Sequence, residues 1–176
     1  MTRGAKTVRN FGIMLAVLAA AFWQSPLYFT SDSCVMASME SLGFSPCEII
    51  CEDSYAGNHI YVLRNKNDVY AIHETQRIGP FWKTAGGATG MDFSPRDSGP
   101  LFVTQSGDDT ASYIVCKRLS PEIAWVEWRW AYDQTVRADD WTQDILVMVA
   151  QQPWEETWGT VTAYNAAGDV VCVWQR

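Results

Sequence analysis

The chain has 176 residues, of which 48% are hydrophobic and 19% charged, a balance that argues against a disordered protein. It carries 13 basic and 20 acidic residues, for a formal net charge of −7. Nucleic-acid binding and docking on anionic lipid headgroups both need basic surfaces, so we expect neither a nucleic-acid partner nor a headgroup-binding surface.

The first 29 residues have the composition of an export signal or a membrane anchor. Three basic residues and no acid precede a charge-free apolar run at 11–23, which is typical of a secretory signal. Small residues at 19–21 offer a cleavage site. An uncleaved segment reaching Phe29 is just long enough to cross a bilayer. We therefore expect 1–29 to be a signal peptide or transmembrane anchor and 30–176 to be a single extracytoplasmic domain.

Five cysteines leave at least one thiol unpaired in a monomer: Cys34, Cys47, Cys51, Cys116 and Cys172. Cys47 and Cys51 are about 13 Å apart in a straight strand, which is too far for a disulfide. The spacing permits a disulfide between Cys116 and Cys172, and another from Cys34 to Cys47 or Cys51. The alternative is that the cysteines are buried free thiols. Closely spaced metal-ligating pairs are absent from the sequence, so we expect no metal or other cofactor.

The domain begins with a helix followed by a strand. Thr30 or Ser31 can cap a helix over 32–42, whose apolar residues recur at helical spacing. Gly43 is placed to end that helix. The segment 47–51 then predicts the first strand.

The segment Asn58–Thr84 has the most regular β pattern in the chain. Runs of β-branched and aromatic residues at 60–63 and 69–72 flank a polar turn and predict a hairpin, with a third strand at 78–83. The segment Gly86–Pro100 contains four glycines and two prolines, which predicts a long loop.

Later segments alternate between strand and turn patterns. Strands are expected at 101–104, 112–119, 123–132, 145–150, 160–164 and 170–174. The run 145–150 is continuously apolar and predicts a buried central strand, whereas 134–142 is polar and predicts a loop. Within 123–132, alternation places Trp125 outward, beside a same-face pair of Glu127 and Arg129.

About eight or nine short strands predict a mainly β (α+β) fold, an antiparallel β-sandwich or half-barrel with one short N-terminal helix. The signal or anchor helix precedes it.

A resemblance follows from this order of elements. The residues that carry it are MESLG at 39–43 leading into CEII at 47–50, then YVL at 61–63, VYAI at 69–72, GPFWK at 79–83 and TAYNAAGDVV at 162–171. In this layout the chain resembles small uncharacterised exported or membrane-anchored β-domain proteins of Gram-positive bacteria. The resemblance implies a membrane-tethered or secreted β-domain and supplies no catalytic residues.

The two histidines could carry chemistry if the hairpin brings them together. Pairing Leu63 with Val69 would place His59 opposite His73, where they could hold a metal or supply a base. Ordinary packing is the more common role for strand histidines. The sequence has no Gly-x-Ser-x-Gly nucleophile motif, so we assign no catalytic residue.

Tryptophans outside the expected strands are the stronger candidates for a binding site. Trp82, Trp154 and Trp158 lie at strand ends or in connections, where they could stack on sugar rings or anchor a protein partner. Their alternative role is to cover the ends of the sandwich.

The sequence thus favours a non-enzymatic domain at the bacterial cell surface that binds an envelope protein or another envelope component. A carbohydrate-binding module is the second hypothesis, and a small secreted hydrolase is the third.

Overall fold

The computed structural model describes residues 9–17, 27–91, 93, 99–109, 111–130 and 134–175. Residues 9–17 form a helix with exposed side chains. None of the helices in these ranges is both long and apolar enough to span a bilayer. Residues 1–8 and 18–26 of the expected export signal, including its candidate cleavage site, lie outside the described residues, and Tyr28 near its end pairs with Trp82.

The rest of the described chain is mainly β, as expected. Helix α2 spans Ser31–Ser41, and a short 3-10 helix, η2, spans Trp154–Glu156. Eleven strands occur in the described ranges, more than the eight or nine expected: β1 (Cys47–Tyr55), β2 (Asn58–Asn65), β3 (Tyr70–Ile78), β4 (Phe81–Met91), β5 (Leu101–Gly107), β6 (Ser112–Arg118), β7 (Trp125–Trp130), β8 (Gln134–Ala138), β9 (Ile145–Ala150), β10 (Gly159–Tyr164) and β11 (Val170–Gln175).

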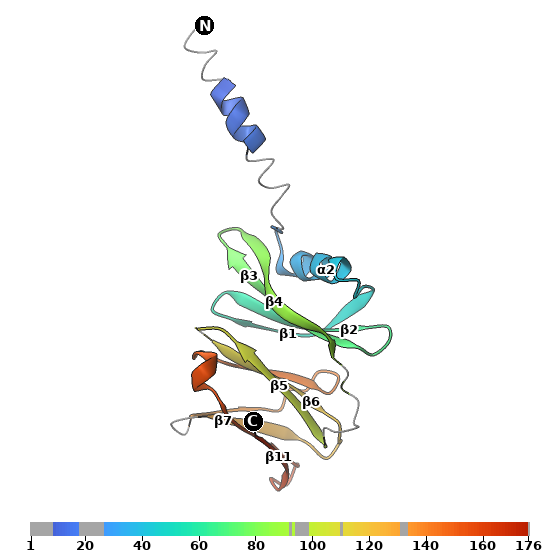
Figure 1. Ribbon diagram of the computed structural model, residues 1–176. Coiled ribbons are helices and arrows are strands. Elements are labelled where there is room, and N and C mark those ends of the chain that lie inside the picture. The colour runs from blue at the N-terminus through green and yellow to red at the C-terminus, as the bar shows by residue number, and fades with distance from the viewer. Residues whose placement is uncertain are drawn as a thin grey trace.

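These strands form three antiparallel sheets that stack face to face (Figure 1). The N-terminal sheet has the order β1-β2-β3-β4, the middle sheet β5-β6-β9, and the C-terminal sheet β11-β10-β7-β8. Helix α2 covers the outer face of the N-terminal sheet, and the middle sheet lies between the other two. The arrangement is sandwich-like, with a third sheet added to the expected pair.

Helix α2 begins and ends where the sequence predicts. Thr30 has an extended backbone, and its hydroxyl oxygen accepts a hydrogen bond from the Ser33 amide at 3.2 Å. Gly43 follows the helix at a φ of 69°, in the left-handed region that glycine enters without strain. Val35 and Met39 are fully buried against the N-terminal sheet.

The predicted hairpin is present as β2 and β3, but its predicted register is wrong by two residues. Leu63 pairs with Ala71 instead of Val69. The reason is a three-residue turn between Asn65 and Val69, closed by Asp68 in the left-handed region at a φ of 57°. The Asn65 side chain accepts the Val69 amide and holds this turn.

Strand β4 occupies half of the predicted glycine-rich loop. It runs to Met91, so residues 86–91 are strand, and most of the remaining loop lies outside the described residues. Gly87 allows β4 to lie close to β3, because a Cβ there would be 2.5 Å from His73 Nδ1. The antiparallel ladder between β3 and β4 is interrupted by two register shifts.

The middle sheet is buried on both faces. Alternate residues of β9 enter two different cores: Ile145 packs toward the N-terminal sheet, whereas Leu146 and Met148 pack toward the C-terminal sheet. This explains the continuous apolar run at 145–150. The run is an edge strand of its sheet rather than the central strand expected, because β6 takes the central place.

The C-terminal sheet confirms the predicted faces of β7 and corrects the loop predicted at 134–142. Trp128 is buried, and Trp125 lies on the opposite face, stacked on Tyr164 with ring centroids 3.8 Å apart. The predicted Glu127–Arg129 pair forms at 2.9 Å. Residues 134–138 form edge strand β8, in which Thr135 and Arg137 are exposed because the face opposite Val136 meets solvent.

The chain alternates between the last two sheets. After β5 and β6 it leaves the middle sheet for β7 and β8, returns for β9, and leaves again for β10 and β11. The closing hairpin of β10 and β11 forms as predicted.

Candidate functional site

The three tryptophans predicted as ligand contacts are not brought together. Trp82 lies on β4, where its backbone pairs with Tyr28 and its ring meets the His59 ring edge-on at a centroid distance of 4.8 Å. Trp158 precedes β10 in the C-terminal sheet and is 40% exposed. Trp154 lies in η2, and its side chain is outside the described residues. Trp82 therefore lies in the N-terminal sheet, whereas the other two lie in the connection between β9 and β10.

The two histidines share one face of the N-terminal sheet without lying opposite each other. His59 pairs with Thr75, and His73 pairs with Tyr61. The His73 imidazole is buried, and neither of its ring nitrogens has a hydrogen-bond partner in the described residues. Burial lowers the pKa of His73. Within the described ranges no group of three metal-ligating side chains occurs.

Cys116 and Cys172 meet in the core between the middle and C-terminal sheets as free thiols. Burial raises the pKa of Cys116, and the neighbouring Cys172 thiol raises it further. Their disulfide stays a prediction.

The C-terminal and middle sheets form a cleft that is lined by amides. It has a volume of about 470 Å³ and is bounded by Trp130, Gln134, Thr135, Val136, Val149, Ala150, Gln151 and Gln152. None of these side chains carries a charge. We call it the glutamine cleft.

Trp130 fixes how the glutamine side chains present their polar atoms. Its indole nitrogen donates hydrogen bonds to Gln134 Oε1 at 3.1 Å and to Gln152 Oε1 at 2.8 Å. Because an indole N–H can only donate, both amides must turn their oxygens toward it. Gln152 Nε2 in turn donates to Gln134 Oε1.

The amide groups that remain can bind a ligand. Three side-chain groups of the cleft make no hydrogen bond within the described part of the chain: Gln134 Nε2, the side-chain amide of Gln151 and the Thr135 hydroxyl. Gln134, Thr135 and Gln151 are exposed. Trp158 directly precedes Gly159, and Gly159 pairs with Trp130 across the β7–β10 ladder. The cleft thus offers unused amide and hydroxyl groups together with an apolar wall.

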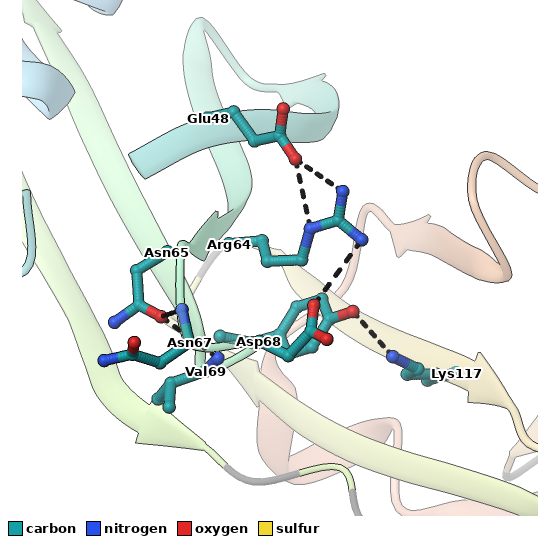
Figure 2. Close-up of polar contacts among 8 residues, drawn as sticks. Glu48, Arg64, Asn65, Asn67, Asp68, Val69 and Lys117 are labelled. Atoms are coloured by element: carbon teal, nitrogen blue, oxygen red, sulfur yellow. Dashed lines mark hydrogen bonds and ion pairs between the residues drawn. The ribbon is translucent and has the colours of Figure 1, made fainter. Parts of the chain in front are cut away.

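A second cleft opens between the N-terminal and middle sheets, next to the β2–β3 turn (Figure 2). It has a volume of about 440 Å³ and is lined by Arg64, Asp68, Tyr70, Phe93, Lys117, Gln143 and Asp144. In Figure 2, Arg64 and Lys117 extend from different strands toward the Asp68 turn. We call it the lysine cleft.

The turn at Gln143 and Asp144 borders the lysine cleft with an unusual backbone. Both residues have positive φ values, 48° and 66°, although neither is glycine. Such a two-residue turn closes the Thr142–Ile145 pair. Arg118 stabilises it by donating from Nε to Asp144 Oδ1 at 2.7 Å.

A third cleft, of about 430 Å³, lies at another edge of the same two sheets. Its wall includes Glu74, whose carboxylate accepts hydrogen bonds from the Tyr55 hydroxyl at 3.0 Å and the Tyr113 hydroxyl at 2.6 Å. Burial and the Glu74 charge raise the pKa of both tyrosines. With both of its oxygens engaged, Glu74 joins the two sheets.

Comparison of the chain with protein-family models, curated proteins and solved structures finds no match. The site must therefore be interpreted from its own chemistry. Sequence reasoning missed the glutamine cleft because Gln134 and Gln152 are separated by a whole strand and form no motif. The one available signal was their place in connections beside the aromatic strand β7.

Proposed function

We propose that the chain is an extracytoplasmic binding domain, secreted or tethered by residues 1–29, that binds a neutral glycan in the glutamine cleft. The observation that carries this proposal is the uncharged lining with amide groups turned outward by Trp130. Sugar hydroxyls donate and accept hydrogen bonds, and amides match both roles without a cost for burying charge.

The lining favours binding over hydrolysis. Glycoside hydrolysis uses a pair of carboxyl groups at the scissile bond, and the described residues that line the glutamine cleft include no carboxylate, imidazole or thiol. Val136 and Val149 supply apolar contact for the C–H face of a sugar ring. Trp158, which directly precedes β10 and is 40% exposed, could extend this surface. The basic and apolar composition of residues 1–29, and the resemblance that the order of elements suggests, are the support for a cell-surface location.

The proposal is tested by titrating the full chain with neutral oligosaccharides, including N-acetylated ones, in a calorimeter. Gln134→Leu removes the amide with unused donors and should weaken binding by about tenfold, the loss expected for one hydrogen bond in a formed site. Gln76→Leu, on an exposed position of the third cleft, is the matched control and should bind as the wild type does. Equal affinity in Gln134→Leu, or binding of no neutral oligosaccharide, would reject the assignment.

A further inference from the structure

Lys117 is held by aromatic rings instead of a carboxylate. Its Nζ lies 4.1 Å from the centroid of the Tyr70 ring and 5.5 Å from that of Phe93. Both rings are 4% exposed, and they contact each other at 4.6 Å. Cation–π attraction therefore fixes the ammonium in place on a rigid aromatic surface.

Both carboxylates that line the lysine cleft are paired with arginines. Asp144 pairs with Arg118, and Asp68 pairs with Arg64 at 3.8 Å. Among the described residues no carboxylate lies within 4.0 Å of Lys117 Nζ. In a chain with an excess of acids, this cation at the edge of a cleft has no counterion among the residues that the structure describes.

The Tyr70 hydroxyl is oriented by one cation of the cleft. Its oxygen accepts a hydrogen bond from Lys117 Nζ at 2.7 Å. Arg64 lines the same cleft. A phenol whose oxygen accepts from a cation has its proton left to donate. That proton and the remaining Lys117 N–H groups are donors for one acceptor.

We propose that the lysine cleft is a binding site for an oxyanion, the carboxylate or phosphate group of a ligand, held by Lys117, Tyr70 and Arg64. Charge-assisted hydrogen bonds from an ammonium, a phenol and a guanidinium are the contacts that such groups accept. The volume of about 440 Å³ accommodates a small molecule or the end of a polymer. The site shares no lining residue with the glutamine cleft, so it stands apart from the neutral-glycan function.

Inorganic phosphate and acetate are the probes for this site. Each is titrated into the full chain at low salt while the backbone amide signals of Lys117, Gln143 and Asp144 are followed by NMR. We expect saturable shifts confined to the cleft that weaken as salt rises, since a partly exposed ion pair is screened. Tighter binding of phosphate would assign a phosphate-bearing ligand, and tighter binding of acetate a carboxylate.

Lys117→Met keeps the apolar stem and removes the charge, so it should lower affinity for the better probe by tenfold or more. Lys83→Met, which removes a lysine from the wall of the third cleft, is the matched control and should retain binding. Tyr70→Phe provides a second test that leaves the charge in place and removes the phenol. Unchanged affinity in Lys117→Met or in Tyr70→Phe, or the absence of saturable shifts in the wild type, overturns the proposal.

Discussion

Tyr113 of the middle sheet donates a 2.6 Å hydrogen bond to the Glu74 carboxylate of the N-terminal sheet. Tyr113 is only 2% exposed, so its hydroxyl depends on this acceptor. The bond connects two sheets that no backbone ladder joins. It is a polar contact in a largely apolar interface, as is the Lys117–Tyr70 hydrogen bond.

Replacing Tyr113 by phenylalanine should lower the free energy of unfolding by about 1 to 3 kcal/mol, because a hydrogen bond to a charged group is lost. Denaturant unfolding followed by fluorescence measures the change. Tyr164→Phe is the control, since its hydroxyl has no hydrogen-bond partner among the described residues and its ring would keep the stack on Trp125. Equal stability of the two variants would show that the bond to Glu74 contributes little.

Gly159 should tolerate no side chain. A Cβ there would be 1.9 Å from the Arg129 carbonyl oxygen on the neighbouring strand. Gly159→Ala must therefore push β10 away from β7, and we expect it to cost about 1 to 3 kcal/mol or more in thermal or denaturant unfolding. Gly86→Ala is the control, because a Cβ at that position meets nothing within 4 Å. A stable Gly159→Ala variant would contradict this packing.

The free energy of unfolding should fall as the pH drops below about 6.5, the ordinary pKa of histidine. Burial lowers the pKa of His73 in the folded chain, so below about pH 6.5 the unfolded chain binds a proton that the folded chain does not. The free energy of unfolding then declines by at most about 1.4 kcal/mol per pH unit from this one group.

Urea unfolding at several pH values between 7 and 5 measures this slope. His73→Leu should flatten it, because no titratable group remains at that position. The charged or titratable groups on the same interface are Asp32 and Cys34 of α2 and His59 and Tyr61 of β2, and all stay in place in this variant. His59→Gln, the control, should keep the wild-type slope because His73 remains. An unchanged slope in His73→Leu would assign the pH dependence to other groups.

The Cys116–Cys172 disulfide is expected if the chain is exported to an oxidising compartment. Thiol counting on denatured protein isolated from the source should then find three free thiols instead of all five. Peptide mass spectrometry identifies the bridge. Five free thiols would establish that the pair remains reduced, which its raised pKa values favour by keeping both sulfurs protonated.

Local structural features could be predicted from the sequence wherever one or two neighbouring residues determine them. The Thr30 cap, the Gly43 helix end and the Glu127–Arg129 pair all follow from short spacings and are present. The closing hairpin around Asn165 follows from the same kind of signal.

Features that depend on distant partners were not readable. Edge strand β8 looked like a loop because its buried side consists of only Val136 and Ala138 against the core. Residues 86–91 of β4 looked like a loop because their glycines carry no pattern, and only the ladder with β3 makes them a strand. The register error of two residues followed from the position of the turn, because residues 66–68 connect the paired Asn65 and Val69, and this shift separated the two histidines.

The binding clefts were hidden for the same reason. Lys117 and Arg64 are far apart in the chain and approach only because two sheets stack. The Gln134 and Gln152 amides are aligned only by the Trp130 indole. The tryptophan prediction was a statement about residue type, and the structure separates the two because Trp82 lies in the N-terminal sheet and Trp158 in the connection between β9 and β10.

Because the chain alternates between the last two sheets, these two sheets should unfold together. A backbone cut at any connection from β5 to β10 leaves at least one of these sheets incomplete, because the strands of both alternate along the chain. During synthesis, the middle sheet cannot close until β9 has emerged, after two strands that belong to its neighbour. This half of the protein should accordingly assemble late and melt as one unit, and proteolysis should yield either intact protein or small peptides.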